Sequence, residues 1–342
     1  MVQKNIKHAN LFWLFLIIVF IILQVVIGRM DLGIVPRIAI LQGFIIVACF
    51  VYLKLDKRDI KETLHLQGFH IGSAFLVILL AICLSPVISL INAVSMLFVE
   101  NAVTSTLSEL TNIGLLPALL LVALTPAVAE ELTFRGVLFG TYRKTDRLVS
   151  AVFVSALAFG LMHMNLNQFC YAFVLGIVMA VLVEITGSIF ASSLLHFCFN
   201  GSSMVLYFVM KWLPDFMEKL MKDYPDQFTP QTKEMYETTI AQLRDTLSGN
   251  TVIQREQLVE AIYKYIPAAI VGLIFAVLLL IAIASLNNRT DNLKALIGKK
   301  TTAVAAAYPE DRAAKLVTVG YIISAIICVG MCVLAFFAEK LV

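Results

Sequence analysis

The chain has 342 residues, of which 60% are hydrophobic and 14% charged, and its mean hydropathy is +0.90. This composition is far more apolar than that of a typical soluble domain, so it predicts a multi-pass membrane protein. The formal net charge of only +3 leaves no basic footprint for a nucleic-acid partner. The lysines and arginines are therefore interpreted as topology signals.

Apolar runs of about 20 residues are needed to cross the hydrocarbon core of a bilayer. Nine approximate spans are predicted: 11–27, 34–53, 71–99, 115–142, 148–164, 169–184, 189–213, 266–286 and 316–337. The first follows Lys4 and Lys7 but is long for a signal peptide and is followed by no small-residue cleavage site, so we interpret it as an uncleaved span. The sequence thus predicts an all-α, polytopic helical bundle of about nine spans around a central polar cavity.

The spans divide the chain into four predicted regions. Residues 1–110 carry three spans, 111–213 carry four spans and form the expected catalytic core, and 265–342 carry two more. Between them, 214–264 is mixed in charge, and its pieces 230–247 and 253–265 have helical spacing of apolar residues. We expect this segment to be a small extramembrane helical insert.

Loop charges predict the orientation of the bundle. With the N-terminus in the cytoplasm, the basic loops 54–61, 143–147 and 289–315 all fall inside, as cytoplasmic loops should. The acidic loop with Glu100 and Glu109 and the 214–264 insert then fall outside. This agreement supports both the number of spans and a cytoplasmic N-terminus.

The stretch 127–140, AVAEELTFRGVLFG, places Glu130, Glu131 and Arg135 inside an apolar run. Ionisable residues at that depth are costly and usually functional. Glu131 and Arg135 are spaced i,i+4 and can pair on one helix face, whereas Glu130 lies on another face without a local partner. Pro126, one turn upstream, removes a backbone hydrogen bond and can open the helix. A structural charge cluster and a water-holding functional site both explain this pattern.

Two of the five histidines, His163 and His196, lie within predicted spans. His196 and Asn200 are four residues apart and share a helix face. At a rise of 1.5 Å per residue, Glu130, His163 and His196 lie about 20, 22 and 12 Å from the presumed cytoplasmic ends of their spans. Each histidine alone is explained by a hydrogen bond to a carbonyl, but their shared depth favours one common pocket.

Two chemistries fit such a pocket. Zinc hydrolysis would use Glu130, His163 and His196 as ligands, although no HExxH motif is present. Metal-free hydrolysis would use Glu130 as general base and His163 to orient the water, while His196 and Asn200 donate to the oxyanion. Asparagine is a poor zinc ligand, which favours the metal-free route without a cofactor.

The motifs EExxxR (130–135), FxxxH (Phe159 to His163) and HxxxN (His196 to Asn200) together resemble those of the CPBP, or Abi, family of intramembrane glutamic endopeptidases, which includes the CAAX prenyl endopeptidases. The resemblance covers about residues 115–210. It implies a cavity open to one side and peptide-bond cleavage by a glutamate-activated water. It also implies Glu130, His163, His196 and Asn200 as catalytic residues, supported by Glu131, Arg135 and Phe159.

The expected function is therefore cleavage of a membrane-associated or prenylated protein or peptide, in a bacterial plasma membrane, with the lipid bilayer as the other partner. Two functions of other classes stay open: a proton-coupled transporter, which would favour an internal repeat that the sequence lacks, and a non-catalytic peptide-binding scaffold. Glu184, at the end of the sixth span, is interpreted as an interfacial carboxylate.

Overall fold

The computed structural model describes residues 1–99, 110–248, 254–298 and 314–339, and within these ranges every regular element is a helix. In the same ranges, eight helices are long and apolar enough to cross a membrane. They are α1 (Val2–Gly28), α2 (Ile34–Leu55), α4 (Ile71–Met96), the composite helix Leu115–Tyr142, α10 (Leu166–Thr186), α11 (Ile189–Asp223), α13 (Arg255–Leu286) and α16 (Val319–Glu339). A further apolar helix, α9 (Leu148–Met162), has 15 residues and is about 22 Å long, shorter than a bilayer core. The predicted all-α polytopic bundle of about nine spans is confirmed.

The remaining described helices are short or lie in the polar segments of the chain. They are α3 (Ile60–Thr63), η1 (Thr111–Ile113), η4 (Pro225–Gln227), α12 (Pro230–Ser248) and α14 (Thr290–Ile297). The predicted acidic loop with Glu100 and Glu109 lies outside the described residues, as does 299–313 of the last basic loop.

The composite helix at the centre of the bundle changes its winding four times. It runs as α6 (Leu115–Leu119), the π-helical segment η2 (Leu120–Leu124), α7 (Thr125–Glu131), the π-helical segment η3 (Leu132–Phe139) and α8 (Gly140–Tyr142). Pro126 lies at the start of α7, where its missing N–H interrupts the backbone ladder. Insertions of π-helix often occur at functional sites, and here two of them flank the turn that carries Glu130 and Glu131.

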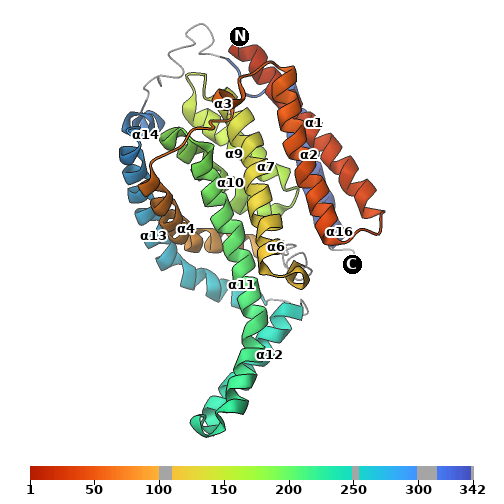
Figure 1. Cartoon of the computed structure of the whole chain (residues 1–342), viewed down its shortest axis with the longest axis vertical. Helices are drawn as coiled ribbons and strands as arrows, with labels where there is room; N and C mark the ends of the chain where they lie inside the picture. The colour runs from red at the N-terminus through yellow and green to blue at the C-terminus, as the bar shows by residue number, and fades with distance from the viewer. Residues whose placement is uncertain (100–109, 249–253, 299–313, 340–342) are drawn as a thin grey trace.

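The other spans surround this composite helix in two groups (Figure 1). α1, α2 and α16 lie along one side, and α4 and α13 pair along the other, with α9, α10 and α11 between them. Small residues permit close approaches of the helices: a Cβ atom at Gly176 would lie 3.0 Å from the Cα atom of Ala156 on α9. This tight contact fixes α10 against α9, next to the composite helix.

The described parts of the three basic loops meet at one end of the bundle. Arg58 donates to the Thr141 hydroxyl at 2.7 Å, and Lys144 pairs with Glu62 at 3.2 Å. Glu184, predicted as an interfacial carboxylate, is fully buried at this end and accepts from Arg143 at 2.7 and 2.8 Å. It is therefore an internal ion-pair partner that ties the loop after α8 to α10.

The polar segment 214–264 forms continuous helices with its neighbours. α11 runs through Pro214 to Asp223, and α12 lies beside its protruding end (Figure 1). Arg244 of α12 donates to Glu218 of α11 at 2.6 Å. α13 begins at Arg255 and continues through Pro267 into the bundle, so the helices extend across both sequence boundaries placed for the insert.

Candidate active site

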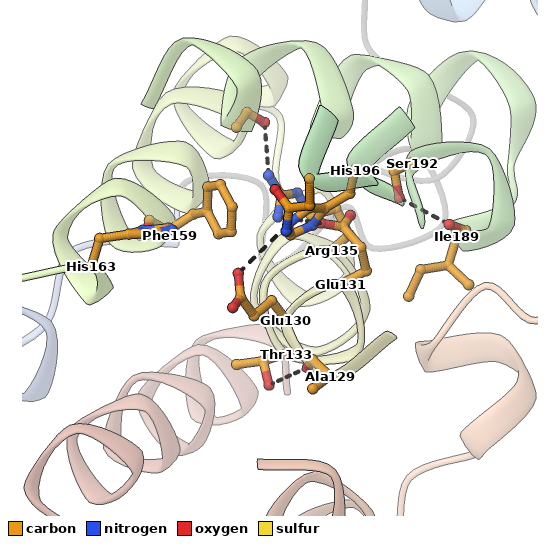
Figure 2. Close-up of polar contacts among 12 residues, drawn as sticks. Ala129, Glu130, Glu131, Thr133, Arg135, Phe159, His163, Ile189, Ser192 and His196 are labelled. Atoms are coloured by element: carbon orange, nitrogen blue, oxygen red, sulfur yellow. Dashed lines mark hydrogen bonds and ion pairs between the residues drawn. The ribbon is translucent and has the colours of Figure 1, made fainter. Parts of the chain in front are cut away.

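Four polar side chains predicted to converge line one pocket of about 420 Å³. Glu130 comes from α7, His163 follows the last residue of α9, and His196 and Asn200 come from α11. Figure 2 shows Glu130 and His196 on two different helices, with His163 at the end of a third. The structure therefore brings these four residues together.

Glu131 and Arg135 form the predicted i,i+4 ion pair. Their Oε1 and Nη1 atoms are 2.7 Å apart, and both side chains are buried. The guanidinium group also lies over the ring of Phe159, 4.1 Å from its centroid. Because both charges are out of water, each depends on the other and on these further contacts.

His196 lies between the two glutamates. Its Nδ1 atom is 3.1 Å from Glu131 Oε1, and its Nε2 atom is 3.9 Å from Glu130 Oε2. An ionised carboxylate only accepts hydrogen bonds, so Nδ1 carries a proton that it donates to Glu131. Nε2 is thereby directed at the pocket and at Glu130.

Glu130 is the less constrained carboxylate. Its side chain is 17% exposed, and its Oε2 atom is buried without a hydrogen-bond partner among the described residues. A buried acceptor without a donor is costly, so this oxygen is suited to hold a proton-donating ligand. The carboxylate borders the pocket.

Phe159 positions His163. The Phe159 carbonyl oxygen is 2.9 Å from His163 Nδ1, and the two rings meet edge to face at 5.1 Å. A carbonyl can only accept, so Nδ1 carries a proton, and in the neutral tautomer of this kind the lone pair is on Nε2. His163 is the residue after α9 rather than within a span, and Met164, with φ of 50°, turns the chain away.

Asn200 is held by a carbonyl that the proline makes available. In an α-helix, residue 126 would donate to the carbonyl of Val122, but proline has no N–H. The Asn200 Nδ2 atom donates to that carbonyl oxygen at 3.2 Å. This leaves the second N–H of the carboxamide for another acceptor.

Sequence reasoning missed several polar residues around this site. Asn92 of α4 and Gln168, Tyr171 and Ser203 line the same pocket. Gln24 of α1 and Gln42 of α2 line a second cavity that Glu130 and His163 also border. The sequence feature that could have identified them is a polar residue inside an apolar span, because such a residue is costly without a partner.

The zinc alternative requires Glu130, His163 and His196 to approach one ion. Within the described part of the chain, no three His, Cys, Asp or Glu side chains are grouped closely enough to hold a metal ion. The donor set therefore does not fit a tetrahedral zinc centre in this arrangement.

Fold and site together define an integral multi-pass membrane protein with a carboxylate, two imidazoles and a carboxamide converging within its bundle. Residues 112–202 match the family model described as Type II CAAX prenyl endopeptidase Rce1-like, so this core is similar to the CAAX proteases that its motifs resemble. The matched segment contains all seven predicted site residues and supports a CAAX-type peptidase. No curated protein and no solved structure matches the chain.

Proposed function

We propose that the protein is an intramembrane glutamic endopeptidase in which Glu130 activates the water that attacks a peptide bond. The observation that supports it is the convergence of Glu130, His163, His196 and Asn200 on one pocket. The substrate is a membrane-associated or lipidated peptide or protein, and the N-terminus lies in the cytoplasm. No cofactor and no nucleic acid take part.

In the first step, Glu130 takes a proton from water while the oxygen attacks the carbonyl carbon of the substrate. His163 accepts a hydrogen bond from the same water through Nε2. His196 Nε2 and Asn200 Nδ2 donate to the carbonyl oxygen as it becomes negative. The C–N bond then breaks, and Glu130 returns its proton to the leaving amine.

Charge balance supports the role of His196. Glu131 and Arg135 neutralise each other at 2.7 Å, which leaves Glu130 as the remaining charge of the group. A second proton on His196 would lie on Nε2, 3.9 Å from Glu130 and opposite Glu131. The imidazolium would thus be stabilised on both sides and could donate to an oxyanion.

The test compares protein termini in membranes of cells that carry wild-type protein or the Glu130→Gln variant. Glutamine keeps the size of the side chain but cannot accept the proton, so we expect cleavage products present with wild type to be lost. The matched control is Glu237→Gln, on the exposed face of α12, which should cleave like wild type. A chelator should not change the result.

Retention of the same termini in a folded Glu130→Gln protein would overturn the proposal. Loss of activity with chelator, restored by zinc, would instead indicate the metal mechanism. If wild type and Glu130→Gln both bound a peptide and neither produced new termini, the protein would be a non-catalytic scaffold.

A further inference from the structure

A second cavity borders the reacting groups from the side of the N-terminal helices. It has a volume of about 180 Å³, and Glu130 and His163 belong to its wall as well as to the wall of the larger pocket. The remaining wall is partly built by α1 and α2, through Leu16, Gln24 and Gln42. Anything in this cavity therefore lies next to the proposed attacking water.

Gln42 lines this cavity, and its side chain carries an unsatisfied polar atom. Its Oε1 atom is buried and has no hydrogen-bond partner in the described chain. Gln42 is the ninth residue of α2 (Ile34–Leu55), about 12 Å from the first residue of the helix. A carboxamide at that depth in an apolar span needs a partner, and the cavity that Gln42 lines is a space from which a partner can approach its side chain.

The size of the cavity limits the occupant. An apolar cavity of ~150 Å³ holds one benzene molecule, so about 180 Å³ is enough for one side chain of moderate size. A peptide backbone with its neighbours would need the larger pocket of about 420 Å³. The two cavities thus suit two parts of one substrate, joined at Glu130 and His163.

We propose that the smaller cavity is a specificity subsite for the side chain of a substrate residue adjoining the cleaved bond. Gln42 selects a side chain with a hydrogen-bond donor, a carboxamide or a hydroxyl. Gln24, exposed at the rim, contacts the same side chain from α1. This proposal depends on the proposed endopeptidase function.

Half of the ten residues that line the subsite lie outside the matched family core. Gln24 and Gln42 precede residue 112, where the family match begins, whereas Glu130 and His163 lie within it. The N-terminal helices therefore provide selectivity, while the core provides the chemistry. A polar site that loses its hydrogen-bonding partner discriminates strongly, because its buried group is left unpaired.

The experiment identifies cleavage sites by terminal-peptide proteomics in membranes with wild type, Gln42→Leu, Gln24→Leu or Glu130→Gln. Cleavage sites that are found with wild type and are absent with Glu130→Gln are those produced by this protein. With wild type, one position beside the cleaved bond should be enriched in Asn, Gln, Ser or Thr. With Gln42→Leu, we expect this enrichment to fall by about tenfold or more in favour of apolar side chains.

Gln242→Leu is the matched control, because Gln242 is exposed on α12 and should leave the preference unchanged. If Gln42→Leu does not fold, as judged by thermal unfolding in detergent, Gln24→Leu serves instead, since its exposed side chain can be changed without opening the core. It should weaken the same preference.

The subsite proposal alone would be overturned if the cleavage sites of wild type lacked this enrichment. It would also be overturned if folded Gln42→Leu and Gln24→Leu proteins kept the enrichment unchanged. Absence of any Glu130-dependent site would overturn the proposed function and the subsite together. The two failures are therefore distinguishable.

Discussion

At the scale of single residues, Glu131 contacts both Arg135 and His196, and the sequence indicated only the contact with Arg135. The i,i+4 pair with Arg135 follows from helix geometry, while the contact of Glu131 Oε1 with His196 Nδ1 at 3.1 Å joins residues of two helices. Glu131 thus orients one ring nitrogen of His196 so that the other faces the pocket. It is a positioning residue for the proposed reaction.

Replacing Glu131 by Gln should destabilise the protein, because Arg135 would be left as a buried charge without its counter-ion. Removing one partner of a buried pair costs about 3–5 kcal/mol. Thermal unfolding in detergent measures this, and the double variant Glu131→Gln with Arg135→Met should be more stable than Glu131→Gln alone. Equal stability of the two would show that Arg135 does not depend on Glu131.

His65 predicts how the loop end of the bundle responds to acid. This residue lies between α3 and α4, and burial, with a smaller contribution from Arg143, Lys144 and Arg289, lowers the pKa of His65 to about 3. An unfolded histidine has a pKa of about 6.5. Between these two values the unfolded chain binds a proton that the folded protein does not, so stability falls as pH falls through this window.

Lowering the pH from 7 to 5 should therefore cost up to about 2 kcal/mol through His65. We expect the unfolding temperature of wild type to fall more than that of His65→Gln over this interval. Parallel pH dependence of the two proteins would mean that His65 is protonated in the fold.

At the scale of elements, the interrupted winding of the composite helix prepares the site. Pro126 leaves the Val122 carbonyl without its α-helical donor, and Asn200 of α11 donates to it at 3.2 Å. A single residue thereby determines how two helices are joined and how the carboxamide is oriented. Proline indicated an opened helix in the sequence, but not which side chain would occupy the opening.

Pro126→Ala restores a backbone N–H that competes with Asn200 for the Val122 carbonyl. We expect a helix at least as stable as in wild type. We also expect the rate of Glu130-dependent cleavage to fall about tenfold. Complete removal of one oxyanion donor lowers a rate by more than this, and here the Asn200 donor is only misoriented. Unfolding temperature and cleavage rate are measured on the same preparation. An unchanged rate in this variant would indicate that Asn200 is oriented by other contacts.

At the scale of the whole molecule, the described parts of the basic loops and the α11–α12 hairpin lie at opposite ends of the bundle (Figure 1). The contacts of Arg58 with Thr141 and of Lys144 with Glu62 hold two of these loops together. One face of the bundle is thus enriched in positive charge, as expected for a cytoplasmic face.

Topology is tested by labelling introduced cysteines with a membrane-impermeant maleimide. Lys61→Cys and Asp146→Cys, both exposed at the basic end, should react only in inside-out vesicles. Asp226→Cys, at the turn between α11 and α12, should react only in right-side-out vesicles. Labelling of all three from the same side would contradict the predicted orientation.

The sequence by itself determined the helical class, the approximate spans and the Glu131–Arg135 pair, because these depend on composition and on spacing within one helix. It also indicated His163, His196 and Asn200 through their motifs. Only the tertiary structure decided that His196 contacts both glutamates, that Asn200 bonds Val122, and that Gln42 faces a cavity beside Glu130. These contacts join residues far apart in the chain, and they depend on the rotation of each helix about its axis, which an all-apolar span leaves undefined until its neighbours pack against it.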